Sequence, residues 1–140
     1  MNLRVWGIAA VWMLTLSETA HAALVAPSSV TFRHGLKMAP HSRAIIETVA
    51  QAMALDPGIR LVKIEGFTAS PGGDAHNLKL SERRAERVRE VLIELGADPQ
   101  RLLAKGYGET RPLVDEVTKA DRQINNRVEF VVVSAASVAK

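Results

Sequence analysis

The sequence contains no cysteine and few aromatic residues. Its 140 residues include three phenylalanines, two tryptophans and one tyrosine. Without cysteine the chain can form neither a disulfide bond nor a thiolate metal site, and it offers no cysteine that could carry a lipid. The scarcity of aromatic side chains argues against an aromatic cage and against a base-stacking platform for nucleic acid.

Patterns typical of metal sites and catalytic sites are also missing. His34, His41 and His76 do not have the spacing of an H-x-H or H-E-x-x-H zinc site. Residues 70–73 lack the lysine of a phosphate-binding loop and the spacing of a dinucleotide-binding loop, and no G-x-S-x-G surrounds Ser81. We therefore expect no catalytic site, no metal and no cofactor.

The first 22 residues differ in composition from the rest of the chain. Arg4 is followed by a nearly wholly apolar run over residues 5–16, and residues 20–22 (AHA) have small side chains at the two positions that a signal peptidase reads. The apolar run is too short to span a membrane comfortably, because a spanning helix needs about 20 apolar residues. We predict a cleaved signal peptide at 1–22, with an uncleaved anchor as the alternative.

The remainder has the composition of one ordinary globular domain. The whole chain is 47% hydrophobic and 24% charged, with a net charge of +3, and no later apolar run is long enough to span a membrane. Such mild positive charge suits contact with an anionic polymer or membrane face without requiring it. Export makes nucleic acid an unsuitable partner. We expect a lead-in at 23–29, a domain at 30–134 and a tail at 135–140.

Hydrophobic periodicity predicts four strands and two long helices. Alternation in the second strand directs Val62 and Ile64 towards the core, and the Pro-Gly-Gly at 71–73 predicts a loop over residues 68–76. Residues 109–123 form a polar excursion with one or two helical turns. The predicted strands are 30–32, 60–67, 102–105 and 127–134, and the predicted helices are 40–55 and 78–95.

This order of elements predicts a mixed sheet in an α+β domain. The two helical crossovers require parallel pairing between some of the strands, with right-handed connections. The last strand, 127–134, is rich in valine, so we place it inside the sheet and not at its edge. We expect the helices to pack on one face of this sheet.

Several separated motifs resemble the OmpA-like C-terminal peptidoglycan-binding domain family, over residues 30–134. The resemblance implies a βαβαβ-β sandwich with a mixed sheet, and no enzymatic activity. The residues that carry it are Gly66-Phe67-Thr68, Gly72, Asn77, Leu80-Ser81, Arg84-Ala85, Val88 and Leu92, then residues 106–112 (GYGETRP) and residues 125–129 (NNRVE).

Members of this family bind the diaminopimelate of the peptidoglycan peptide stem, so the resemblance implies a wall-anchoring module in the periplasm, with or without outer-membrane association. It implies that Arg84 binds the carboxylate, because an arginine fork can donate two parallel hydrogen bonds. It also places Thr68 and Asn77 at the ligand, although Asn77 could equally be a helix cap. Arg127 is either a second carboxylate contact or a strand residue that pairs with Glu129.

The sequence departs from the family at the acids that bind the ligand's ammonium. The family aspartate falls on Ala69, Arg33 follows Phe32 where an aspartate is frequent, and Asn126 replaces an arginine. One hypothesis is that Asp74, otherwise a plain turn residue, takes over the ammonium. The other is that diaminopimelate binding is lost and the domain is a protein-interaction subunit of a secretion, motor or envelope complex.

Overall fold

The computed structural model describes residues 29–134. The predicted signal peptide and tail, and residues 23–28 of the lead-in, lie outside this part. None of the helices within it is long and apolar enough to cross a membrane. The elements in chain order are β1 (Val30–His34), β2 (Lys37–Met38), α2 (Ser42–Leu55), β3 (Ile59–Phe67), α3 (Asp74–Glu94), the 3-10 turn η1 (Pro99–Arg101), β4 (Leu102–Gly106), α4 (Lys119–Asn125) and β5 (Arg127–Ser134).

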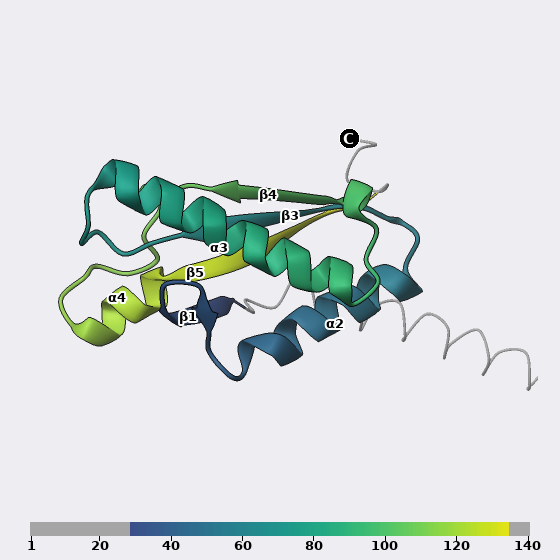
Figure 1. Ribbon diagram of the computed structural model, residues 1–140, viewed down its shortest axis with the longest axis horizontal. Coiled ribbons are helices and arrows are strands. Elements are labelled where there is room, and N and C mark those ends of the chain that lie inside the picture. The colour runs from purple at the N-terminus through teal and green to yellow at the C-terminus, as the bar shows by residue number, and fades with distance from the viewer. Residues whose placement is uncertain (1–28, 135–140) are drawn as a thin grey trace, which may run out of the picture.

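The strands form one mixed sheet in the order β2-β1-β5-β3-β4 (Figure 1). The last strand, β5, lies between β1 and β3 and is antiparallel to both, which confirms its predicted interior position. Strands β3 and β4 are parallel and are joined through α3. Since β1 and β3 are both antiparallel to β5, they also share one direction, as a helical crossover through α2 requires.

The two long helices pack on the same face of the sheet and enclose the core with it. Every second side chain of a strand faces the helices, and Val62 and Ile64 are fully buried there as predicted. The α+β class with helices on one face is thereby confirmed (Figure 1). The helical side of the core consists of Ile46, Val49, Ala50, Ala52, Met53, Ala85, Val88, Val91 and Leu92.

Helix α3 begins four residues earlier than the periodicity predicts. Gly72 and Gly73 have φ angles of 121° and 81°, values that favour glycine, and they turn the chain directly into the helix. Asp74 then stands in the first turn, where a negative charge interacts favourably with the helix dipole. The predicted loop over residues 68–76 is therefore wrong at its end, because residues 74–76 are helical.

A small hairpin that the sequence analysis did not predict follows β1. Gly35, with φ of 51°, turns the chain so that His34 pairs with Lys37 at the start of β2. The second strand has only two residues, too few for any alternation to be visible in the sequence. The hairpin matters for the site because it directs the carbonyl oxygen of Gly35 towards α3.

Helix α3 approaches β3 and β4 very closely at Ser81. A Cβ atom on Gly66 would lie 2.2 Å from the carbonyl oxygen of Ser81, and one on Gly106 would lie 2.4 Å from the amide nitrogen of Glu82. The Ser81 hydroxyl donates to the carbonyl of Leu78 and accepts from the amide of Gly108. Ser81 therefore fastens the helix to the sheet.

Candidate functional site

Arg84 lies in the middle of α3 and is buried, with 5% of its surface exposed. Its Nε donates to the carbonyl oxygen of Gly35 at 2.9 Å, and its Nη1 donates to Oδ1 of Asn126 at 2.9 Å. The guanidinium carbon lies 5.1 Å from the ring centroid of Phe32. The hairpin, β1 and the residue before β5 therefore all hold this side chain in place.

The positive charge of Arg84 has no carboxylate partner among residues 29–134. Burial lowers the pKa of Arg84, yet an arginine remains protonated at neutral pH. Arg101 also lacks an acid, but it donates to three carbonyl oxygens near the C-terminal end of α2, where the helix dipole favours a cation. A buried charge without an opposite charge beside it is costly, so an anion bound next to Arg84 would be stabilised.

The loop that follows β3 lies directly beside Arg84. The amide of Ala69 donates to Oδ1 of Asn126 at 3.3 Å, and this same oxygen accepts from Arg84. Asn126 thus bridges the arginine and the position where the family has its aspartate. Arg33, at the other departure from the family pattern, is exposed near the end of β1. Asn126 is a site residue that the sequence analysis noted only as a departure.

Asn77 holds this loop in its conformation. Its side chain is buried, and Nδ2 lies 3.2 Å from the carbonyl oxygens of both Ala69 and Ser70. The same nitrogen lies 2.6 Å from Oε2 of Glu109, to which it donates. Asn77 is therefore a loop-positioning residue, and Glu109 is a neighbour that the sequence analysis missed.

Replacing Asn77 with alanine is expected to lower the free energy of unfolding by about 2 kcal/mol. The carbonyl of Ala69 would lose a donor in a buried setting and that of Ser70 in a partly buried one, and an unsatisfied buried polar group costs about 1–3 kcal/mol. Urea denaturation followed by circular dichroism measures the change. The control is Asp74→Ala, an exposed change at the start of the same helix, expected to cost under about 1 kcal/mol. Equal losses in the two variants would contradict the positioning role of Asn77.

A second acid, Glu116, reaches the loop from the segment between β4 and α4. Its Oε1 accepts from the amide of Ser70 at 3.0 Å and from Nδ2 of Asn125 at 3.0 Å. Its Oε2 accepts from the Ser70 hydroxyl at 2.6 Å. Partial burial raises the pKa of Glu116, but the hydrogen bonds from Ser70 and Asn125 outweigh this, so its pKa lies below the usual value. No local sequence pattern indicated this residue.

Asp74, the predicted replacement for the missing aspartate, is exposed in the first turn of α3. It precedes Arg84 by ten residues in one helix, a separation of about 15 Å along the axis. The structure therefore does not bring Asp74 and Arg84 together.

Thr68, another predicted ligand contact, lies at the end of β3 and is buried. Its amide donates to the carbonyl of Gly108 at 2.9 Å. Its hydroxyl oxygen is the only buried side-chain polar atom in the described part of the chain that has no hydrogen-bond partner. A role for this hydroxyl in ligand binding stays a prediction.

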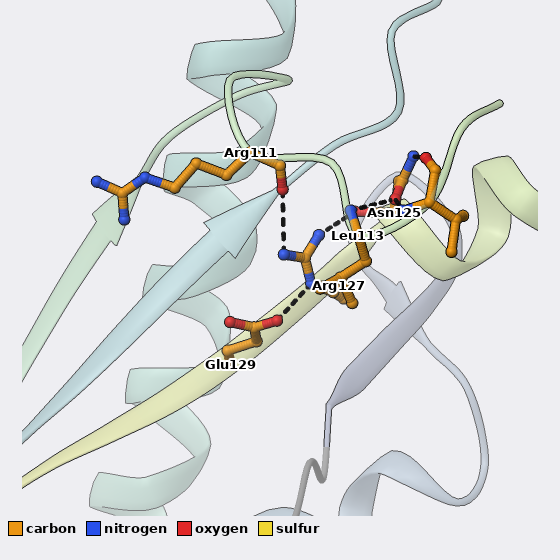
Figure 2. Close-up of polar contacts among 6 residues, drawn as sticks. Arg111, Leu113, Asn125, Arg127 and Glu129 are labelled. Carbon is orange, nitrogen blue, oxygen red and sulfur yellow. Dashed lines mark hydrogen bonds and ion pairs between the residues drawn. The ribbon is translucent and has the colours of Figure 1, made fainter.

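Arg127 lies on the face of the sheet opposite the helices. It pairs with Phe67 across β5 and β3, whereas the next residue, Val128, faces the core. Its guanidinium forms an ion pair with Glu129, donates to the carbonyl of Arg111 at 3.2 Å (Figure 2) and lies over the Phe67 ring. Arg127 thus lies on the sheet face opposite the helix that carries Arg84, and its ion pair matches the alternative of a strand residue that pairs with Glu129.

Asn125 organises the segment that leads to β5. It is fully buried, and its Oδ1 accepts from the amides of Leu113 and Val114 at 2.9 and 3.2 Å. Figure 2 shows Asn125 beside Arg127, with the contact to Leu113 marked. This asparagine and its donation to Glu116 fix the polar excursion against the end of the sheet.

Comparison with curated proteins finds relatives in bacterial envelopes. The chain is 45% identical to outer membrane porin F of Pseudomonas fluorescens over 97 residues, which are 69% of this chain and 29% of that protein. It is 38% identical to the outer-membrane lipoprotein YfiB of Pseudomonas aeruginosa over 106 residues, which are 75% of this chain and 62% of that protein. The chain thus spans less than two thirds of the length of either relative.

Solved structures share the fold. The peptidoglycan-associated lipoprotein from Burkholderia pseudomallei superposes with a TM-score of 0.72 at 28% identity, over 79% of this chain and 93% of that one. The C-terminal domain of MotB from Helicobacter pylori gives a TM-score of 0.70 at 27% identity, over 80% of this chain and 89% of that one. These relatives agree with the predicted periplasmic location. The OmpA family model matches residues 33–127, and the chain therefore belongs to the OmpA family.

Proposed function

We propose that this chain is a non-catalytic periplasmic module that binds peptidoglycan through the diaminopimelate of its peptide stem and helps to anchor an envelope assembly. The observation that carries the proposal is Arg84, a buried cation with no acidic partner among residues 29–134. Only its Nε and Nη1 make hydrogen bonds within these residues, so Nη2 has bonding capacity left for a ligand. A guanidinium fork matches the geometry of a carboxylate, to which it can donate two parallel hydrogen bonds.

The first test is sedimentation of the purified protein with sacculi that contain diaminopimelate. Wild type is expected to pellet, and Arg84→Met is expected to bind at least about tenfold more weakly, since a hydrogen bond to a charged group contributes about 1.5–3 kcal/mol. Arg83→Met is the matched control, because Arg83 is an exposed neighbour with the same charge. Equal binding by the two variants would contradict the proposal, and circular dichroism establishes that both are folded.

The second candidate is a protein-interaction subunit of an envelope complex. It is favoured by Ala69, which supplies no carboxylate where the family has one, and by the exposed Arg33 near the end of β1. The same assay distinguishes the candidates. Wild-type protein that stays in the supernatant at low ionic strength, where charge attraction is strongest, would favour this second function.

A further inference from the structure

The carboxylate of Glu116 is fixed between the loop after β3 and the end of α4 by neutral donors. The amide and the hydroxyl of Ser70 and Nδ2 of Asn125 all donate to it. These contacts join residues that are 46 and 9 positions apart in the sequence, so the acid is held in a defined place by two separate parts of the fold. An acid held in this way is oriented before any ligand arrives.

The negative charge of Glu116 is not neutralised by an ion pair among residues 29–134. Partial burial raises its pKa, but its hydrogen bonds and the nearby positive charge of Arg122 stabilise the ionised form, so the pKa lies below the usual value. Three donor groups do not exhaust a carboxylate, which can accept about four hydrogen bonds. The side chain is also partly exposed, so a ligand can reach it.

A short chain of contacts connects Glu116 to Arg84. Arg84 donates to Asn126, Asn126 accepts from the amide of Ala69, and the next residue, Ser70, donates to Glu116. The cation and the anion thus lie on either side of Ala69 and do not neutralise each other. A ligand that carries both a carboxylate and an ammonium would find an opposite charge for each of them here.

We propose that Glu116 accepts the ammonium of the ligand whose carboxylate Arg84 binds, in place of the aspartate that the chain lacks at Ala69. This inference rests on the proposed function and deepens it. The ligand class is a free amino-acid terminus, as found at the unlinked end of diaminopimelate. Asp74 suits this role less well, because it stands ten residues before Arg84 in α3, about 15 Å along the helix axis.

The proposal predicts which chemical groups of the ligand the site distinguishes. A disaccharide-tripeptide with diaminopimelate presents one free ammonium and one carboxylate on the same carbon. Its N-acetylated form lacks the ammonium, and the lysine-type fragment lacks the carboxylate. Wild type is expected to bind the first fragment about 10–100-fold more tightly than either of the others, because each loses a charge-assisted contact.

The test is calorimetric titration of wild type, Glu116→Gln and Arg84→Lys with these three fragments. Glu116→Gln keeps an oxygen that accepts from Ser70, and it is expected to lose the preference over the N-acetylated fragment while it keeps the preference over the lysine-type fragment. Arg84→Lys is expected to lose mainly the preference over the lysine-type fragment. Asp115→Asn is the matched control, because Asp115 is an exposed acid directly before Glu116 in the chain, and it is expected to behave as wild type.

The outcomes separate the inference from the function on which it rests. If Glu116→Gln prefers the free ammonium as strongly as wild type does, Glu116 is not the acceptor, although peptidoglycan binding stands. If Asp115→Asn loses the preference for the free ammonium while Glu116→Gln keeps it, the acceptor is Asp115 and the inference is overturned. If wild type binds none of the fragments, both the proposed function and the inference are overturned.

Discussion

Replacing Gly66 with alanine is expected to destabilise the domain by about 3 kcal/mol, near the upper end of the usual range for overpacking a core. The added Cβ would lie 2.2 Å from the carbonyl oxygen of Ser81, a backbone atom that cannot move without shifting α3. Helix α3 carries Arg84, so the shift would also disturb the site. Urea denaturation measures the loss as a lower transition midpoint.

Gly58→Ala is the matched control for this prediction. The nearest atom to a Cβ at Gly58 is Oδ1 of Asp56, at 2.9 Å, and this atom ends a side chain that can shift, although it accepts a hydrogen bond from the Gly58 amide. Alanine also restricts the unfolded chain, which favours folding slightly. We expect a change of less than about 1 kcal/mol. A loss as large as that of Gly66→Ala would show that the close contact between helix and strand is not the cause.

Replacing Arg127 with methionine is expected to cost about 3 kcal/mol of stability. Arg127 is 2% exposed, and its loss removes the ion pair to Glu129 and the donors to the carbonyls of Asn125 and Arg111. Breaking a buried pair by removing one partner typically costs about 3–5 kcal/mol, and the partial exposure of Glu129 reduces this. Thermal unfolding followed by circular dichroism measures the change.

Arg111→Met is the control for Arg127, because both guanidinium groups lie over neighbouring stacked rings. Arg111 lies 4.2 Å from the centroid of Tyr107, which stacks on Phe67, and it is exposed. An exposed cation–π contact contributes about 0.5–1 kcal/mol. At temperatures where Arg127→Met is folded, it should still pellet with sacculi. A folded variant that fails to pellet would restore Arg127 as a ligand contact.

Much of the fold was predictable because the relevant information is local or concerns hydrophobicity alone. A valine-rich strand is typical of the interior of a sheet, and β5 indeed lies between two other strands. The alternation of apolar and polar residues around Val62 and Ile64 was likewise sufficient to predict which face of β3 is buried. The β1–β2 hairpin was not predicted, since a two-residue strand has no periodicity. The predicted start of α3 was wrong because the apolar pattern begins only at residue 78, whereas the two glycines with positive φ already end the loop before residue 74.

Residues of the candidate site were predictable only where they occupy a position in the family motif. The register of Arg84 and Asn77 in the family pattern identified two positions that meet at the loop after β3, through Asn126 and Ala69. Glu116 could not be found in this way, because its contact with Ser70 joins positions 46 residues apart. Such a contact depends on the packed positions of two loops, which composition and spacing do not encode.

The surroundings of Arg84 come from segments that are far apart in the chain, and this links ligand binding to folding. The carbonyl of Gly35, the amide of Ala69 and the side chain of Asn126 meet only when the hairpin, β3 and β5 are all in place. An unfolded chain therefore presents no receptor. By mass action, any ligand that occupies this receptor raises the free energy of unfolding by RT ln(1 + [L]/Kd), and the unfolding temperature rises with it, so the melting curve itself reports ligand binding.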